Sequence, residues 1–169
     1  AAEFVNHGDT IFLDSGSTAL QMVPFLAEKK NLTVITYSIP VIAGLIKYPQ
    51  IRTIALPGMV LSRTASLVGH STCAALSSFN CAKAFMGCTG LSLSRQLTNA
   101  TMEEYEVKQV ALRQSKLHYL LADHEKFDHA ALMTYADIST MDYVITNREP
   151  EEQYKNHFEE HQIRWILAN

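Results

Sequence analysis

The segment Thr10-Ile11-Phe12-Leu13-Asp14-Ser15-Gly16-Ser17-Thr18 runs from a strand through a turn into a helix. Thr10–Asp14 is short, contains β-branched and aromatic residues and is apolar on both faces, which is typical of a buried parallel strand. Gly16 and its serine neighbours mark a turn before the helical pattern that follows. A buried strand that leads directly into a helix indicates an α/β fold.

Strands of the same kind recur along the whole chain, separated by helix-like stretches. Their alternation predicts an α/β fold with a mainly parallel sheet flanked by helices. No repeat, low-complexity tract or linker interrupts the pattern, so we expect a single domain over residues 1–169. The predicted strands are Thr10–Asp14, Leu32–Thr36, Ile51–Leu56, Ala82–Met86, Lys116–Ala122, Tyr143–Thr146 and Ile163–Leu167.

Prolines and capping residues mark several helix boundaries. Ser38 is expected to cap a helix that has Pro40 in its first turn. Pro24 falls inside the helical stretch Thr18–Ala27, so it must kink that helix or delay its regular part. Pro150 is expected in the first turn of the last helix.

The segment that begins at Thr101 predicts a capped, amphipathic helix. Thr101 and Glu104 fit a capping box, and Val107 and Ala111 lie on one face of the helix that follows. Glu104 and Lys108 stand four residues apart, in the order that favours an ion pair on a helix surface.

Composition narrows the classes of protein. The chain has 169 residues, of which 47% are hydrophobic and 18% are charged, so it is long and apolar enough to bury a core. The net charge of −3 argues against nucleic-acid binding by this chain alone, since that usually needs a basic face. No apolar run approaches the ~18 residues of a membrane span. Three cysteines without a CxxC pair predict reduced thiols, and with no signal peptide they favour the cytoplasm.

The loop after the first strand is a candidate phosphate cradle. In an open parallel sheet, ligands bind outside the carboxyl ends of the strands. Gly16 lets the backbone approach a ligand closely, and the helix start that follows offers free N–H groups. Ser15, Ser17 and Thr18 add hydroxyl donors. Glycine and serine also serve turn geometry alone, so the loop by itself leaves both interpretations open.

Small or polar residues follow the other predicted strands as well. Because the carboxyl ends of parallel strands meet at one edge of a sheet, we expect an anion-binding pocket at this edge. Lys126 would supply a positive charge to a phosphate, as would Arg63 or Arg95. The loops concerned are Thr36–Pro40, Pro57-Gly58, Gly87–Gly90 and Asp123–Lys126.

These motifs resemble the C-terminal effector-binding domain of DeoR-family bacterial transcription repressors across nearly the whole chain. Gly8–Thr18 resembles the opening strand and phosphate loop of the family, and Asn31–Pro40 resembles its second block. The order and spacing of the motifs carry the resemblance. The further blocks are Leu56–Gly58, Ser66–Gly69, Lys83–Gly90, Leu97–Asn99 followed by Glu106–Lys108, Leu121–Phe127 and Asp142–Thr146.

The resemblance implies a fold like that of ribose-5-phosphate isomerase and the CoA transferases, and a phosphorylated sugar or related metabolite as effector. The resemblance also implies that effector binding would change the affinity of a winged helix-turn-helix domain for operator DNA. That domain is expected upstream, joined through a helix whose tail is Ala1–His7 with Gly8 as its C-cap, so this chain alone should bind no operator. We also expect a homo-oligomer, because repressors of this kind read paired half-sites.

The expected effector-binding residues combine the ligand loops of the family with acidic residues at the strand ends. No cofactor is expected with them. They are Asp14, Ser15, Gly16, Ser17, Thr18, Tyr37, Ser38, Gly58, Gly87, Gly90, Glu106, Asp123 and Lys126.

Departures from the family pattern fall at the same pocket. Tyr37 stands where the family usually has Asn, Pro57 where it has Gly, and His124-Glu125 where it has Ser-Ser. These residues add bulk, hydrogen-bonding groups and negative charge. They indicate an effector that is unusual for the family, or an altered pocket.

A sugar-phosphate isomerase-like enzyme is the alternative function. Such an enzyme needs a general base near the substrate carbon, and Glu106, Asp123 and Glu125 are candidates by position. The acidic and lysine-glycine motifs of the isomerase do not occur in recognisable form. We therefore expect binding without catalysis.

A metal site is the third possibility. His157 and His161 stand four residues apart on the last predicted helix, a spacing that suits two metal ligands. That helix is polar along one side, so its histidines are expected to face water and no metal site is expected.

Overall fold

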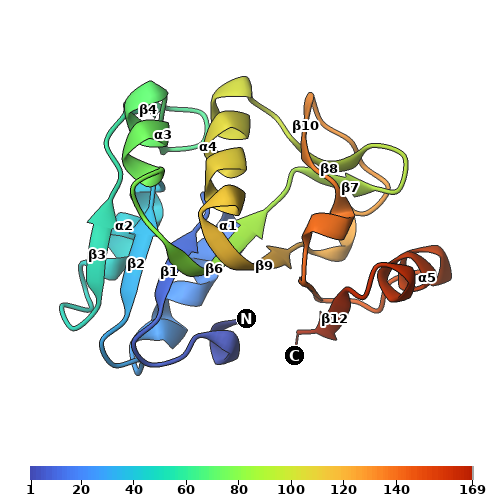
Figure 1. The fold of residues 1–169 in the computed structure, drawn as a ribbon, viewed down its shortest axis with the longest axis horizontal. Coiled ribbons are helices and arrows are strands. Elements are labelled where there is room, and N and C mark those ends of the chain that lie inside the picture. The colour runs from blue at the N-terminus through green and yellow to red at the C-terminus, as the bar shows by residue number, and fades with distance from the viewer. Residues whose placement is uncertain (169) are drawn as a thin grey trace.

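Seven parallel strands form the central sheet, each close to its predicted range. In this computed structural model, which describes residues 1–168, the strand order is β12-β11-β9-β6-β1-β2-β3 and every neighbouring pair is parallel (Figure 1). The expected α/β architecture is confirmed. The strands are β1 (Thr10–Leu13), β2 (Thr33–Thr36), β3 (Arg52–Ala55), β6 (Cys81–Gly87), β9 (Ser115–Leu121), β11 (Tyr143–Thr146) and β12 (Arg164–Leu167).

Successive residues of the central strands enter two separate cores. Ile11 and Leu13 of β1 pack in one core, and Phe12 packs in the other. Side chains alternate between the two faces of a strand, so a strand covered on both faces needs an unbroken apolar run. This is why Thr10–Leu13 lacks the polar alternation of a half-exposed strand.

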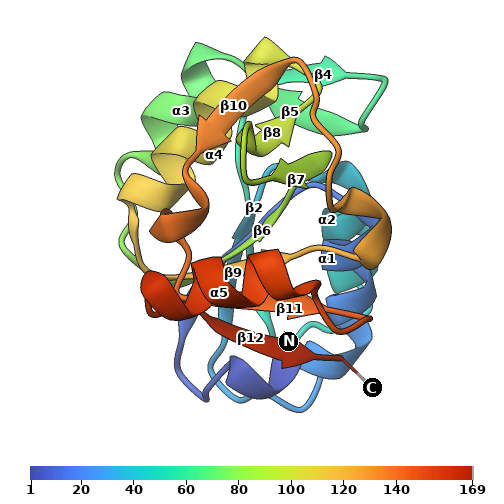
Figure 2. The ribbon, with the colours of Figure 1, turned by 90° about the vertical axis from the view of Figure 1, so that its right-hand side faces the viewer.

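Helices cover both faces of the sheet. The short helices η1, α1, η2 and α2 pack on one face, and α3, α4 and α5 pack on the other. Figure 2 shows α1 and α2 on one side of the strands and α3 and α4 on the opposite side. The helices are η1 (Ala2–Phe4), α1 (Ser17–Met22), η2 (Val23–Leu26), α2 (Ile39–Leu45), α3 (His70–Leu76), α4 (Met102–Arg113), η3 (His124–Lys126), η4 (Ile138–Thr140) and α5 (Glu152–Glu160).

The direction in which strands are added reverses between β1 and β6. From β1 the chain builds outward through β2 to β3, and it then returns to add β6, β9, β11 and β12 on the other side of β1. The loops after β1 and β6 therefore diverge and leave a crevice at the carboxyl ends of these two strands. Such a reversal is the usual ligand site of an open parallel sheet.

The predicted helix boundaries at Pro24, Ser38 and Thr101 are confirmed. The regular helix α1 ends at Met22, and the 3-10 helix η2 has Pro24 near its start. Ser38 Oγ accepts from Val41 N at 3.3 Å, and Thr101 Oγ1 accepts from Glu104 N at 3.2 Å. Each cap satisfies an N–H group that has no partner within its helix.

Two other boundary predictions are wrong. Residues 1–7 do not form the tail of a regular helix, because only η1 is helical. Val5, which follows η1, has an extended backbone. Its side chain is buried in the core beside α1. Gly8, with φ of +83°, lies in a turn where its N–H donates to Lys30 O at 2.9 Å. Pro150 precedes the last helix, since α5 begins after Glu151.

Five short strands lie outside the sequence prediction. A hairpin joins β4 (Met59–Leu61) to β5 (Ser66–Val68), and a three-stranded antiparallel sheet combines β7 (Gly90–Ser92), β8 (Gln96–Asn99) and β10 (Met133–Ala136). Each has only three or four residues, which is too short for a periodic pattern to appear. Among residues 1–168, no helix combines the length and hydropathy that a membrane crossing requires.

Gly58 holds the β4–β5 hairpin close to α3. A Cβ atom at this position would lie 2.3 Å from Thr72 Oγ1 and 2.8 Å from Val68 O. Thr72 Oγ1 itself donates to Pro57 O at 2.6 Å, which fixes the threonine in place. The absence of a side chain at Gly58 is therefore a packing requirement of the hairpin.

Substitution of Gly58 tests this packing. We expect Gly58→Ala to lower the free energy of unfolding by about 1–3 kcal/mol, because the added methyl group overlaps backbone and a fixed hydroxyl. Gly16→Ala is the matched control, since a Cβ at Gly16 meets no atom within 4 Å. Urea denaturation of both variants provides the measurement, and equal stabilities would contradict the role given to Gly58.

Candidate functional site

A cavity of about 240 Å³ opens at the carboxyl ends of β1 and β6. Its position is the crevice left by the reversal of strand order. This volume lies somewhat below the range of about 300–1,000 Å³ typical of sites for drug-sized molecules, so it suits a small metabolite. The lining residues are Asp14, Ser15, Gly16, Thr64, Gly87, Cys88, Thr89, Asn99, Glu104 and Lys108.

The carboxylate of Asp14 joins four parts of the chain at the base of this cavity. Its Oδ1 accepts from Tyr37 Oη at 2.6 Å and from Ser15 N at 2.8 Å. Its Oδ2 accepts from Gly87 N at 2.7 Å and from the ammonium group of Lys108. Asp14 and Lys108 are both buried, and a buried charge persists only when it is paired and hydrogen-bonded in this way.

Helix α4 contributes two charged side chains to the cavity. Lys108 Nζ also donates to Gly87 O at 2.9 Å. One turn earlier, Glu104 Oε1 accepts from Ser15 Oγ at 2.9 Å and Oε2 accepts from Thr101 Oγ1 at 3.0 Å. The two residues share a helix face, as predicted, but that face is buried against the loops after β1 and β6.

The buried hydroxyl and thiol groups of the site are held in their protonated forms. Burial raises the pKa of Tyr37 well above its usual range, and the carboxylates of Asp14 and Glu104 raise it further. Burial raises the pKa of the Cys88 thiol to about 12, although the ammonium groups of Lys108 and Lys126 act in the opposite direction. Tyr37 is thus a fixed donor to Asp14, and Cys88 does not provide a thiolate at neutral pH.

One buried acceptor in the wall has no partner. Asn99 Nδ2 donates to Thr101 O at 2.7 Å, which fixes the orientation of the amide. Within residues 1–168, Asn99 Oδ1 is shielded from solvent and accepts no hydrogen bond. A buried polar atom without a partner is costly, so a donor from a bound molecule would stabilise this site.

The structure brings together only part of the predicted set. Asp14, Ser15, Gly16 and Gly87 line the cavity, and Tyr37 supports it from behind through Asp14. Lys126 lies close enough to Cys88 to influence its pKa, which puts its charge near the same cavity.

Other predicted residues have roles in packing or capping. Ser38 caps α2, and Gly58 holds the β4–β5 hairpin. A Cβ at Gly90 would lie 2.4 Å from His129 O, so this glycine permits close packing of two loops. Ser17 is exposed and is not among the residues that line the cavity.

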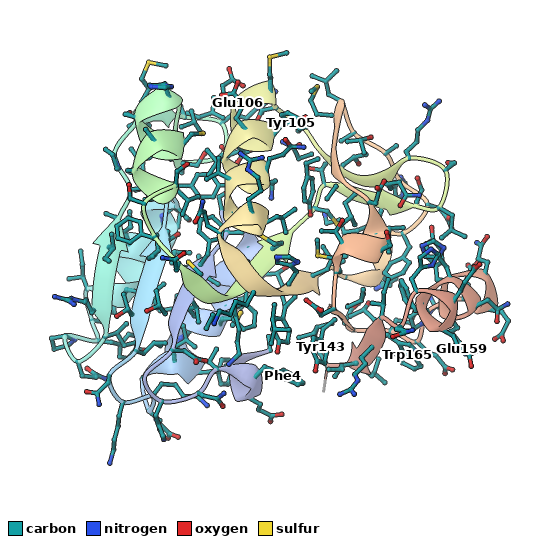
Figure 3. The ribbon with its side chains drawn as sticks, in the orientation of Figure 1. Phe4, Tyr105, Glu106, Tyr143, Glu159 and Trp165 are labelled. Atoms are coloured by element: carbon teal, nitrogen blue, oxygen red, sulfur yellow. The ribbon has the colours of Figure 1, made fainter. Side chains whose placement is uncertain are left out.

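Glu106 points away from the cavity. It is exposed near the beginning of α4 (Figure 3). Burial raises the pKa of the Cys73 thiol on α3, and the charge of Glu106 adds to this rise, which places Glu106 on the side of α4 that faces α3. The residue two positions earlier, Glu104, occupies the cavity instead, because the buried stripe of α4 includes Glu104 and Lys108 but not Glu106.

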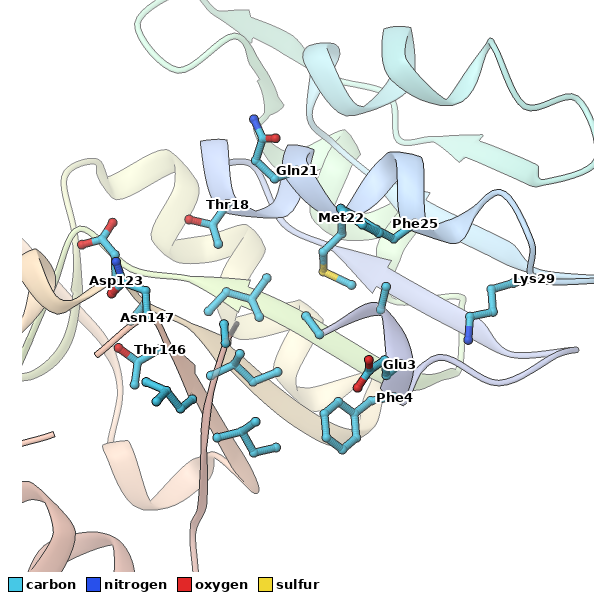
Figure 4. Close-up of a pocket in the computed structure, with 18 of the residues that line it drawn as sticks. Glu3, Phe4, Thr18, Gln21, Met22, Phe25, Lys29, Asp123, Thr146 and Asn147 are labelled. Carbon is cyan, nitrogen blue, oxygen red and sulfur yellow. The ribbon is translucent and has the colours of Figure 1, made fainter. Parts of the chain in front are cut away.

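Thr18 and Asp123 line a second, larger cavity. This groove of about 710 Å³ lies between η1, α1, η2 and the ends of β9, β11 and β12 (Figure 4). Its polar end contains Thr18, Asp123, Thr146 and Asn147. Asp123 also accepts from Glu125 N at 3.0 Å, so its carboxylate caps the 3-10 helix η3.

The sequence prediction missed several residues that line the smaller cavity. The one available signal was the pair of charges on the otherwise apolar stripe of α4, which sequence alone cannot distinguish from a surface ion pair. Thr64 comes from the unpredicted β4–β5 turn. The missed residues are Thr64, Asn99, Glu104 and Lys108, while Cys88 and Thr89 belong to the loop Gly87–Gly90 that was expected at the pocket.

Comparison with known protein families and proteins gives a consistent picture. A family model described as the DeoR C terminal sensor domain matches residues 1–148. The chain is 35% identical over 168 residues to the HTH-type transcriptional regulator IolR of Bacillus subtilis, which covers 99% of this chain and 67% of that protein. It is 26% identical over 167 residues to the glycerol-3-phosphate regulon repressor of Escherichia coli, which covers 99% of this chain and 66% of that protein. The chain thus spans about two thirds of the length of these relatives.

Solved structures share the fold at low sequence identity. Ribose 5-phosphate isomerase A from Neisseria gonorrhoeae superimposes with a TM-score of 0.53 and 17% identity, over 75% of this chain and 49% of that chain. The expected isomerase-like fold is confirmed by this similarity, which concerns the fold alone.

The pair between Asp14 and Lys108 should be essential for stability. We expect Lys108→Met to lower the free energy of unfolding by about 3–5 kcal/mol, because it leaves the Asp14 carboxylate buried without a counter-charge. Glu106→Gln, an exposed change on the same helix, should alter stability by less than about 0.5 kcal/mol. Urea denaturation monitored by circular dichroism measures both, and a Lys108→Met variant as stable as Glu106→Gln would contradict this role.

Proposed function

Because this chain belongs to the DeoR family and is its C-terminal sensor domain, we propose that it binds a small phosphorylated sugar or related metabolite in the cavity that has Asp14 and Lys108 in its lining. Binding of the metabolite would change the affinity with which a winged helix-turn-helix domain of the same protein binds operator DNA. The observation that carries the proposal is a polar, partly unsatisfied cavity at the switch point of an all-parallel sheet.

The walls of the cavity suit the hydroxyl groups of a sugar. Each sugar hydroxyl both donates and accepts, and the cavity offers the free acceptor Asn99 Oδ1 together with the Glu104 carboxylate and the Thr89 hydroxyl. A purely apolar ligand would leave Asn99 Oδ1 buried without a partner, which is unfavourable.

The loop at Gly16 is the best position for the phosphate. A Cβ placed on Gly16 meets no atom within 4 Å, so a bulky group can approach the backbone here. Lys108 is neutralised by Asp14, so further positive charge has to come from the rim. Lys126 lies near Cys88, and the Arg63 guanidinium donates to Ala100 O at 3.2 Å beside Asn99. Both are within the neighbourhood of the cavity and can attract a dianion.

Regulation would follow from preferential binding to one conformation. A ligand that binds one state of the sensor better than another shifts the balance between them, and the coupling to DNA affinity is a free energy shared by two sites. The relatives named as regulators or repressors support this role, and one of them is described as HTH-type. We propose that the sensor acts as a homo-oligomer, because two-fold operators require paired DNA-binding domains.

The alternative, a sugar-phosphate isomerase-like activity, lacks a free general base. The candidate bases Glu106, Asp123 and Glu125 do not line the smaller cavity. Asp14 and Glu104 do, but each carboxylate is occupied by hydrogen bonds from the protein, and Asp14 is paired with Lys108. A base held in this way is a poor acceptor for a substrate proton, so the geometry favours a sensor.

A charge placed on the Gly16 loop tests the position of the phosphate. We expect Gly16→Asp to weaken binding of a phosphorylated sugar about a hundredfold more than Gly16→Asn, because only the first adds a like charge. The two side chains have nearly the same size, so Gly16→Asn controls for steric effects.

The ligand is first found by a thermal-shift screen of pentose and hexose phosphates, since a ligand at 100 times its Kd adds about 2.7 kcal/mol to stability. Calorimetry then compares the two variants with the unsubstituted chain. Equal affinities of the two variants would place the phosphate elsewhere, and a screen without any hit would contradict the proposed class of effector.

Incubation with the same sugar phosphates separates the sensor from the enzyme. We expect saturable binding and no conversion, because no carboxylate in the cavity is free to remove a substrate proton. Chromatography or NMR of the incubated sugars measures turnover. The contrary outcome is isomerised product in amounts above a no-protein control, together with loss of that product in a Glu104→Gln variant. This result would support an isomerase and would overturn the proposal of a sensor that binds without catalysis.

A further inference from the structure

The last helix presents a cluster of metal-ligating side chains far from the cavity at β1 and β6. His157 and Glu160 lie on the final turn of α5 and His161 is its C-cap residue, at a spacing that brings the three to one face. One ligand atom from each residue lies within 4.8 Å of those of the other two. Two imidazoles and a carboxylate are the donor set that Zn²⁺ and similar ions use in proteins.

The sequence pattern predicts that His157 faces water, and the structure shows that it does so only in part. Its side chain is only partly exposed, and its Nε2 atom is shielded from solvent and has no hydrogen-bond partner within residues 1–168. The ring packs against that of His161, with centroids 4.2 Å apart. An imidazole nitrogen without a partner is an unsatisfied group that a metal ion would satisfy.

The second histidine is oriented for coordination by the helix backbone. His161 Nδ1 lies 3.0 Å from His157 O, and since a carbonyl oxygen only accepts, Nδ1 carries the proton. The lone pair of His161 is therefore on Nε2. A ring N–H bonded to a backbone carbonyl is the usual support of a metal-binding histidine.

Burial of His157 also favours its uncharged imidazole, which is the form that binds metals. Burial lowers the pKa of His157, and the neighbouring His161 lowers it further.

We propose that His157, Glu160 and His161 bind a divalent transition-metal ion of the Zn²⁺ class, with water completing the coordination. At Zn–N distances of about 2.1 Å, tetrahedral ligand atoms are separated by about 3.4 Å. Rotation of the exposed Glu160 side chain narrows the remaining gap, while His157 and the hydrogen-bonded ring of His161 stay in place. Hard cations such as Mg²⁺ prefer sites made of oxygen atoms alone and would bind weakly here.

The helix that carries these ligands is firmly anchored. Phe158 and Tyr154 are buried in the core, and Tyr154 Oη donates to Asp128 Oδ1 at 2.6 Å. The backbone positions of the ligands are thereby fixed before an ion arrives, which favours affinity.

Titration of the chain with Zn²⁺ tests the site. We expect the unsubstituted chain to bind one ion with high affinity, and His157→Gln and His161→Gln each to lose about tenfold or more in affinity. Glu160→Gln should lose less, because an amide oxygen can still coordinate. His70→Gln removes an exposed histidine on α3 and should leave the affinity unchanged. Circular dichroism confirms that each variant is folded.

Cobalt provides an independent measurement. Co²⁺ bound by two imidazoles and a carboxylate should give visible absorption bands that disappear in a double variant, His157→Gln with His161→Gln. The proposal is overturned if the double variant binds Zn²⁺ as tightly as the unsubstituted chain, or if His70→Gln loses affinity to the same extent. A chain that binds Mg²⁺ and Zn²⁺ equally well would also overturn it.

Discussion

The buried carboxylate of Asp14 is the interaction on which the rest of the structure depends. It accepts hydrogen bonds from β2 through Tyr37, from the end of β6 through Gly87, and from α4 through Lys108. Removal of any donor would leave a buried charge incompletely satisfied, which proteins rarely tolerate. Strands β1, β2 and β6 and the longest helix, α4, are therefore held in one arrangement, which fixes the walls of the cavity above Asp14.

The same network explains why the cavity is suited to recognition. Asp14 and Lys108 neutralise each other in an ion pair. They therefore shape the cavity, but neither charge is available to bind a ligand or to accept a proton from it. The groups that remain available are neutral or at the rim, chiefly Asn99 Oδ1 and the open backbone at Gly16. These groups are the basis for the proposed binding of a polar metabolite, and the fold shared with isomerases does not by itself make the site catalytic.

The central sheet could be predicted from the sequence because most of its strands are short runs rich in apolar β-branched or aromatic residues. The kink at Pro24 and the cap at Thr101 could also be predicted, since they depend only on local chemistry. The hairpin from Met59 to Val68 could not, because strands of three residues acquire their conformation from partners distant in the sequence. For the same reason Thr64, carried by that hairpin, was missing from the predicted site.

The sequence by itself determined the class of fold and indicated the edge of the sheet at which the cavity lies, with Asp14, Ser15 and Gly16 in its wall. Only the tertiary structure decided which charged residue of α4 enters the cavity. Glu104 and Glu106 are chemically identical and two positions apart, and a helix turns about 200° over two residues. Which of them is buried depends on how α4 is rotated against the sheet, a rotation set by the packing of Val107 and Ala111 rather than by any local signal.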